Sequence, residues 1–266
     1  MEIATTIAPI ALAIIMFGLG LGLEVKDFFK VITKPRDFII GFICQVILLP
    51  IVAFILIKFL IIPVEIALGV MVIAAAPGGV TSNILTKFAD GDVALSLALT
   101  AVVSLLCIFT VPLIVFNSAD LLGISFASQE INISGTALKM SLVVAVPVIV
   151  GMMIRKFADN FISSRETIVN KITGFLFLVV FIAIWIEERE NIFNYLSQAG
   201  LVVLNLNIVM MAIAYFLAKT FASGIKQVKS ISLECGLQNG TLAIFVATEI
   251  SNEIIYIIPT AAYALI

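Results

Sequence analysis

Long apolar runs alternate with short polar loops along the whole chain. Nine of these runs approach the roughly 20 apolar residues that a helix needs to cross a bilayer. We expect helices at residues 4–23, 38–60, 64–88, 92–116, 135–155, 169–187, 199–221 and 227–249, and from 254 onward. The last run reaches Ile266 after about a dozen residues, and we expect that helix to continue. The pattern predicts an all-α polytopic membrane protein whose residues 1–266 form a single transmembrane domain.

Two of the runs are interrupted in the middle by polar residues and glycines. The first interruption reads AAPGGVTSN from Ala75 to Asn83, and the second reads SLECGLQNG from Ser232 to Gly240. Each frees backbone groups that lipid cannot bond, so each must face protein or a water-filled cavity. We expect the glycines of both interruptions to let the backbone turn. One such break in each half of the chain is typical of transporters, which bind ions and substrate at discontinuous helices.

Composition supports a membrane protein and excludes several other classes. The chain is 62% hydrophobic and 12% charged, which is not the composition of a soluble domain. Its net charge of −2 excludes a nucleic-acid partner held by a basic surface, and no protein partner is evident beside the membrane lipids. The chain has no histidine, which removes His-ligated zinc, Ser-His catalysis and histidine proton relays. Three cysteines in apolar runs argue against a disulfide framework.

Positive charge is distributed unevenly between the loops. Twelve of the 15 lysines and arginines fall in one set of alternate loops, and only Lys58, Lys139 and Arg189 fall in the other. Cytoplasmic loops carry the excess of positive charge. We therefore expect a multi-pass protein of the inner (plasma) membrane with its N-terminus outside and its C-terminus in the cytoplasm. In this orientation the two broken helices run in opposite directions, which predicts inverted repeats of four helices each.

Glu234 is the one carboxylate that this topology places at bilayer depth. A charged residue at the bilayer centre costs about 2.5–3.5 kcal/mol on insertion scales and is a functional residue by default. The alternative is a protonated glutamate that only bonds a neighbouring helix. Gln238 follows one helical turn later, and carboxylate, carbonyl and amide oxygens together suit a hard cation such as sodium.

Further polar residues lie at the same depth. Ser96 and Thr100 are four residues apart and therefore share one helix face. Alone, they would be expected to bond their own helix and help it to pack. The nearby Ser82 and Asn83 of the first break favour a role as ligands instead. Gln45 is the one amide in its segment, and a buried hydrogen bond between helices explains it equally well.

The two interruptions also predict a place for an anion. The second half of each broken helix begins near Thr81 and near Gln238. A helix start carries free N–H groups and the positive end of the helix dipole, which attract negative charge. We therefore expect an organic anion to bind where these two starts meet.

The chain resembles the bile acid:sodium symporter family over nearly its whole length. The stretches that carry the resemblance are IIMFGLGLGLEVKDF (Ile14–Phe28), CQVILLP (Cys44–Pro50), PGGVTSNILTKFADGDVALSLALT (Pro77–Thr100) and LECGLQNGTLA (Leu233–Ala243). The combination of Pro-Gly-Gly…Ser-Asn with Glu…Gly-x-Gln-Asn is specific to that family. The resemblance implies a symporter, not an enzyme, that couples two sodium ions to the import of an organic anion by alternating access.

The resemblance also implies a role for individual residues. It implies one sodium site made by Ser82, Asn83, Ser96, Thr100 and Glu234. It implies a second made by Gln45, Glu234, Gln238 and the backbone carbonyls of Cys235 and Leu237. The substrate is expected beside Thr81, Asn239 and Gly240, with the intramembrane amide Asn207 close to it. A panel of helices 4–23, 135–155 and 169–187 is expected to move against a core formed by the other six.

The chain departs from the family pattern at the expected substrate end. Val80 stands where a threonine usually follows Gly-Gly, and Gly240 stands where a serine usually follows the asparagine. Sodium coupling therefore transfers better than substrate identity, and smaller carboxylates such as pantoate-like or keto acids are as good a match as bile acids. An arsenite- or auxin-type permease of the same superfamily, coupled to protons, is the alternative. An intramembrane enzyme or receptor is a third, although paired catalytic aspartates, Ser-His and His-zinc sites are all missing.

Overall fold

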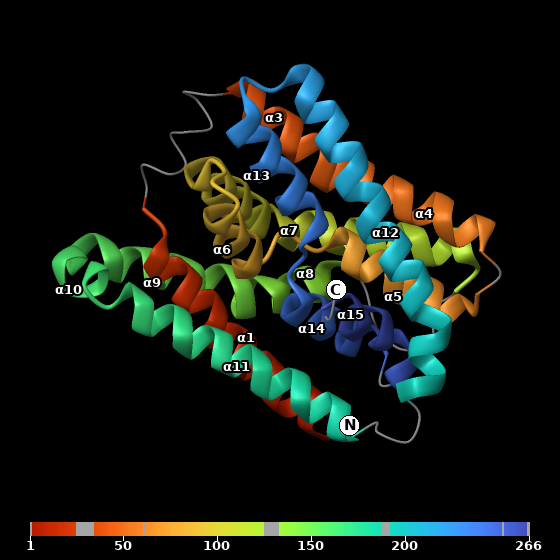
Figure 1. Cartoon of the computed structure of the whole chain (residues 1–266). Coiled ribbons are helices and arrows are strands. Elements are labelled where there is room, and N and C mark those ends of the chain that lie inside the picture. The colour runs from red at the N-terminus through yellow and green to blue at the C-terminus, as the bar shows by residue number, and fades with distance from the viewer. Residues whose placement is uncertain are drawn as a thin grey trace.

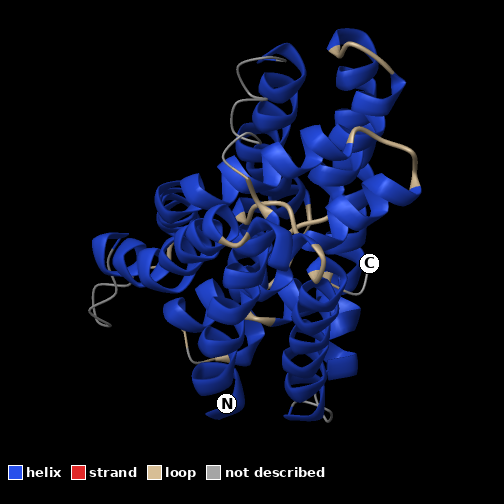
Figure 2. Cartoon of the chain, turned by 90° about the vertical axis from the view of Figure 1, so that its left-hand side faces the viewer, coloured by secondary structure: helices blue, strands red, loops and turns tan. Residues whose placement is uncertain are grey.

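The computed structural model describes residues 2–24, 35–60, 62–124, 133–187, 192–251 and 253–264, and nearly all of them are helical (Figures 1 and 2). No strand longer than an isolated bridge occurs in these ranges. Four spans are long and apolar enough to cross a membrane, namely Pro35–Phe59, Val93–Leu122, Ile133–Phe157 and Ala199–Phe221. The all-α membrane class predicted from the sequence is therefore confirmed. Lys26, Lys30, Lys34 and Arg189, which contributed to the predicted orientation, lie outside the described residues.

The span Pro35–Phe59 changes from α-helix to π-helix in its middle. α3 (Pro35–Phe42) continues into a π-helical stretch, η1 (Ile43–Leu48), and then into α4 (Leu49–Phe59). Pro50 has no N–H, and its ring would clash with the carbonyl four residues earlier in a regular α-helix, which a wider turn relieves. The sequence predicted the span but not this wider turn.

A later span repeats the same arrangement. α8 (Ile133–Met140), the π-helical stretch η2 (Ser141–Ala145) and α9 (Val146–Phe157) form one helix, and Pro147 follows η2 just as Pro50 follows η1. A proline two residues past each stretch gives both the same physical cause.

Both predicted interruptions divide a span into two short helices. The first break separates α5 (Val64–Ala75) from α6 (Val80–Phe88), and the second separates α13 (Ile225–Gly236) from α14 (Gly240–Ile250). The extended residues cross in antiparallel fashion. The N–H of Gly79 donates to the Leu237 carbonyl at 3.1 Å, and the N–H of Asn239 donates to the Pro77 carbonyl at 2.8 Å. Each break thus satisfies backbone groups of the other, which the apolar surroundings require.

One long helix has a clear local signal at each of its ends. α7 (Val93–Leu122) begins at Asp92, whose side chain accepts a hydrogen bond from the Leu95 N–H at 3.1 Å, and ends at Gly123 with a φ of +80°. It runs six residues beyond the predicted end at 116. The chain continues through α10 (Asp159–Ser163), α11 (Glu166–Glu187), α12 (Ile192–Phe221), η3 (Ile254–Tyr256) and α15 (Ile258–Tyr263).

The helices form two packed groups. α1 (Glu2–Gly22) packs along α9 and α11, and Figure 1 shows α1 and α11 side by side at one edge of the molecule. In the larger group, α12 packs against α13 and α15, and α5 packs against α4 and α7. Contacts of α1 with α14, and of α7 with α8, join the two groups. The crossing of the breaks lies in the larger group, on the side that faces α1 and α11.

Candidate functional site

A buried carboxylate lies beside the crossing of the two breaks. Glu234 is fully buried in the last turn of α13, so it belongs to the helix rather than to the unwound residues after it, where the sequence analysis placed it. Its carboxylate accepts a 2.8 Å hydrogen bond from the Ser96 hydroxyl and a second hydrogen bond from the Thr100 hydroxyl. No described lysine or arginine forms a salt bridge with it. A buried carboxyl group with only neutral donors around it is stabilised either by a bound cation or by protonation.

Asn83 extends this cluster from α6. Its side-chain oxygen also lies 2.8 Å from the Ser96 hydroxyl, whose single proton is shared between Asn83 and Glu234, and its amide nitrogen donates to the Thr100 hydroxyl at 3.2 Å. Ser82 is fully buried next to it and donates to the Gly79 carbonyl at 2.6 Å. The structure therefore brings together, from α6, α7 and α13, all five residues predicted for the first sodium site. Thr86, which the sequence analysis did not single out, adds a further buried hydroxyl 3.4 Å from that of Ser96.

The residues predicted for the second sodium site also meet. The Gln45 amide, in the π-helical stretch η1, lies 3.4 Å from both the Glu234 carbonyl and the Gln238 side-chain oxygen. The Gln238 amide donates to the Cys235 carbonyl at 2.9 Å. The Leu237 carbonyl, which accepts from Gly79, faces the first break. The carbonyl oxygens of Cys235 and Leu237 each keep a second lone pair with which they can bind an ion.

One atom of this second group lacks a partner. The side-chain oxygen of Gln45 is buried and receives no hydrogen bond. Such an orphaned acceptor is rare and costly unless something unseen satisfies it. A sodium ion bound by this oxygen together with the side chain of Gln238 and the neighbouring carbonyls would do so. The donor set is all oxygen, and the described residues contain no cluster of His, Cys, Asp and Glu that would suit a transition metal.

The glycines of the breaks allow close approach rather than unusual turns. Among the described residues only Gly123 is a glycine with positive φ, so the backbone of the breaks turns without a left-handed glycine. A Cβ placed on Gly78 would overlap the carboxylate of Glu234 and lie 3.0 Å from the amide of Gln45. A Cβ on Gly236 would overlap the side chain of Met211. The missing side chain of Gly78 lets the first break approach the polar cluster, and that of Gly236 lets α13 pack against Met211.

The C-terminal end of α13 is held by two side chains. The Asn207 amide donates to the Gly236 carbonyl at 2.6 Å, and the Tyr263 hydroxyl donates to the same carbonyl at 2.8 Å. Asn207 does not line the cavity described below, although the sequence analysis placed it near the substrate. Asn205, two residues earlier, is exposed and bonds the Leu201 carbonyl of its own helix. No pattern in the sequence pointed to Tyr263, because a tyrosine in an apolar helix is common.

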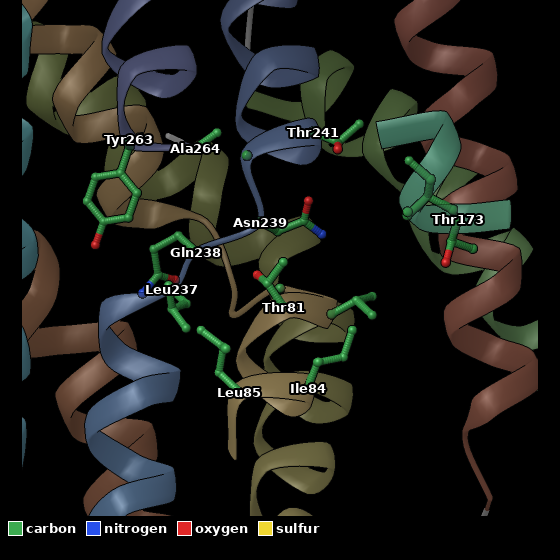
Figure 3. Close-up of a pocket in the computed structure, with 15 residues that line it drawn as sticks. Thr81, Ile84, Leu85, Thr173, Leu237, Gln238, Asn239, Thr241, Tyr263 and Ala264 are labelled. Carbon is green, nitrogen blue, oxygen red and sulfur yellow. The ribbon is translucent and has the colours of Figure 1, made fainter. Parts of the chain in front are cut away.

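A cavity of about 300 Å³ opens beside the crossing (Figure 3). Its lining includes Thr81, Asn239 and Gly240, the three residues beside which the substrate is expected. Asn239 caps α14 by accepting a 3.0 Å hydrogen bond from the Leu242 N–H. Figure 3 shows its side chain directed into the space that separates the broken helices from Thr173 of α11. The cavity therefore lies between the two groups of helices, with polar atoms at its centre and apolar walls.

Comparison with known proteins gives concordant matches. The model of the Sodium Bile acid symporter family matches residues 9–195. The chain is 34% identical over 245 residues to the uncharacterized sodium-dependent transporter YocS of Bacillus subtilis (strain 168), covering 90% of this chain and 73% of that protein. It is 25% identical to the probable sodium/metabolite cotransporter BASS2, chloroplastic, of Oryza sativa subsp. japonica, covering 97% of this chain and 60% of that protein. It is 29% identical to the ileal sodium/bile acid cotransporter of Oryctolagus cuniculus, covering 90% of this chain and 68% of that protein.

Proposed function

The chain belongs to the sodium bile acid symporter family, and on this premise we propose that it imports an organic anion together with sodium by alternating access. The family is one of sodium-dependent transporters and not of enzymes. The observation that carries the proposal is the buried Glu234 carboxylate. The hydroxyls of Ser96 and Thr100 lie within hydrogen-bonding distance of it, and the amide of Gln45, whose oxygen has no partner, lies 3.4 Å from the Glu234 carbonyl.

Two sodium ions account for this arrangement. One would bind among Ser82, Asn83, Ser96 and Thr100, and the other would bind among Gln45, Gln238 and the carbonyls of Cys235 and Leu237. Glu234 would neutralise part of the charge in both sites. The two sites draw on both broken helices, on α7 and on η1. Binding of sodium would therefore hold the two breaks in place and order the surface that receives the anion. Because both ligands favour the same arrangement, binding of sodium would raise the affinity for the anion, and binding of the anion would raise the affinity for sodium.

The cavity favours a compact substrate with an apolar body. Its volume of about 300 Å³ lies at the low end for ligand pockets, which span about 300–1,000 Å³. Val80, Ile84 and Leu85 form apolar walls, and no lysine or arginine of the described residues lines it. A carboxylate would instead be held by the starts of α6 and α14, beside Thr81 and Asn239. Small carboxylates such as keto acids or pantoate fit this cavity better than a bile acid.

Two bodies would supply the alternating movement. We assign α1, α8 with η2 and α9, and α11 to a panel, because α1 packs along α9 and α11. The other helices would form the core that carries both sodium sites. The uneven distribution of positive charge supports an N-terminus outside and a C-terminus in the cytoplasm, with the protein in the plasma membrane.

Uptake into proteoliposomes tests the proposal. Labelled taurocholate, pantoate and 4-methyl-2-oxopentanoate would be offered with an inward sodium gradient, with and without an inside-negative potassium diffusion potential. Two sodium ions with one monovalent anion carry one net positive charge, which gains about 2.3 kcal/mol per 100 mV. Uptake should need sodium and rise with the potential. Uptake that ignores sodium but follows a proton gradient would instead favour the arsenite- or auxin-type alternative.

A further inference from the structure

A second cavity of about 300 Å³ adjoins the first. Val80, Ile84 and Thr173 line both cavities, so they share a wall. The first cavity lies at the start of α6, whereas the second extends along α6 to Lys87 and Phe88 and reaches the end of α1 at Gly22. Together the two cavities form a path between α6 and the pair of helices α1 and α11. This path leads from the crossing of the breaks toward one membrane surface.

Lys87 is the cationic side chain that lines this path. Val80, Ile84 and Lys87 follow one another at spacings of four and three, so they share one face of α6. Seven residues of α-helix place Lys87 about 10 Å along the axis from Val80. Among the described residues that line the two cavities, Lys87 is the only lysine or arginine.

Within the described part of the chain, Lys87 has no partner for its positive charge. It is exposed and forms no ion pair or side-chain hydrogen bond with a described residue. Two other lysines on the predicted cytoplasmic side do have partners. Lys226 pairs with Asp90 at 3.0 Å and lowers the pKa of that carboxyl, and Lys229 donates to the Ala89 carbonyl at 2.7 Å. Lys87 therefore offers a free positive charge at the mouth of an otherwise mainly apolar cavity.

We propose that Lys87 forms a second anion-binding position, which receives the carboxylate of a transported monocarboxylate after it leaves the starts of the half-helices. This inference rests on the proposed function for the identity of the anion. The walls formed by Leu19, Ile84 and Leu97 suit a compact apolar body, and the ammonium group suits its carboxylate. In the proposed orientation the position faces the cytoplasm. Asn83 also lines this cavity, so sodium from the first site would leave through the same opening.

Protection of Lys87 from acylation tests the position without relying on transport. The full chain in detergent, with sodium, would be treated briefly with N-acetoxysuccinimide, and acetylation of Lys87 and Lys226 would be quantified by peptide mass spectrometry. We expect 4-methyl-2-oxopentanoate to slow acetylation of Lys87 several-fold and to leave Lys226 unchanged. Equal acetylation with and without the keto acid, or equal protection by the neutral 4-methylpentanamide, would overturn the proposal.

Uptake of labelled 4-methyl-2-oxopentanoate by variants gives the second test. We expect Lys87→Gln to slow saturated uptake about ten-fold, since a hydrogen bond to a charged group is worth roughly that factor. Sodium-dependent thermal stabilisation should be unchanged, Lys87→Arg should restore uptake, and Lys226→Gln should transport at the wild-type rate. Wild-type uptake by Lys87→Gln would overturn the inference and leave the proposed function intact. Absence of sodium-driven uptake in the wild type would count against the proposed function, while the acetylation assay would still decide whether the anion position exists.

Discussion

Gly78 and Glu234, which come from opposite broken helices, lie so close that a β-carbon on Gly78 would overlap the carboxylate. The same β-carbon would lie 3.0 Å from the amide of Gln45. The first break therefore contributes empty space to the polar cluster as well as ligands. Close contact of this kind couples the position of one broken helix to the charge held by the other.

Gly78→Ala should abolish the sodium response, because the added methyl group must displace the Glu234 carboxylate or separate the two breaks. We expect the sodium-induced rise in melting temperature, measured in detergent, to disappear. Gly22→Ala is the matched control, since a β-carbon there meets nothing within 4 Å. A Gly78→Ala variant with the wild-type sodium response would show that the two breaks do not form one ion site.

Gln45→Ala should weaken sodium binding but preserve the fold. The substitution removes one weak pair of hydrogen bonds, worth about 1 kcal/mol in a membrane, together with the unpartnered oxygen that we assign to the ion. The sodium concentration for half-maximal stabilisation should rise. Asn205→Ala is the control, because that amide is exposed and bonds only its own helix. The same half-maximal sodium concentration in the wild type and in Gln45→Ala would leave Gln45 with a packing role alone.

Removal of either donor to the Gly236 carbonyl should cost about 1 kcal/mol of stability, the usual net value of one hydrogen bond. Tyr263→Phe and Asn207→Ala would each leave the other donor in place. The double variant should lose more than the sum of the single losses, because the buried carbonyl would then have neither donor. Thermal unfolding in detergent measures all three. Strict additivity would mean that the two side chains act independently of this carbonyl.

Single cysteines should label from opposite sides of the membrane. Ser163 and Leu121 are both exposed, at the end of α10 and the end of α7. A cysteine at position 163 should react with an impermeant maleimide only from the cytoplasm, and one at position 121 only from outside. The three native cysteines are buried and should add little background. The reverse pattern would invert the proposed orientation and with it the cytoplasmic position of Lys87.

The sequence was sufficient to locate both breaks and most polar residues of the cluster. Glu234, Ser96 and Asn83 stand out because polar groups in long apolar runs need a specific reason, and the structure brings these residues within hydrogen-bonding distance. Spacing along single helices could predict shared faces. It could not predict which helices meet, so the meeting of α6 with α7 and α13 depended on the family resemblance.

Other features could not be predicted because they depend on tertiary contacts. The close contact of Gly78 with Glu234 and the hydrogen bond from Tyr263 to Gly236 join residues far apart in the chain. The π-helical stretch around Gln45 had a local signal in Pro50, yet a proline alone does not say which wider turn will form. From the sequence, Lys87 is only one of the twelve positive charges in the predicted cytoplasmic loops, and its role depends on the cavity beside it, which no sequence pattern predicts.

Sodium binding to the Glu234→Gln variant tests the central claim most directly. Binding of radioactive sodium to the purified chain would be measured by scintillation proximity, with Glu249→Gln as the control because Glu249 pairs with Lys139 away from the cluster. Glutamine keeps the size of the side chain but removes the charge that we assign to both sites. We predict saturable binding in the wild type and in Glu249→Gln, and none in Glu234→Gln. Saturable binding of wild-type affinity in Glu234→Gln would contradict the proposed sodium sites.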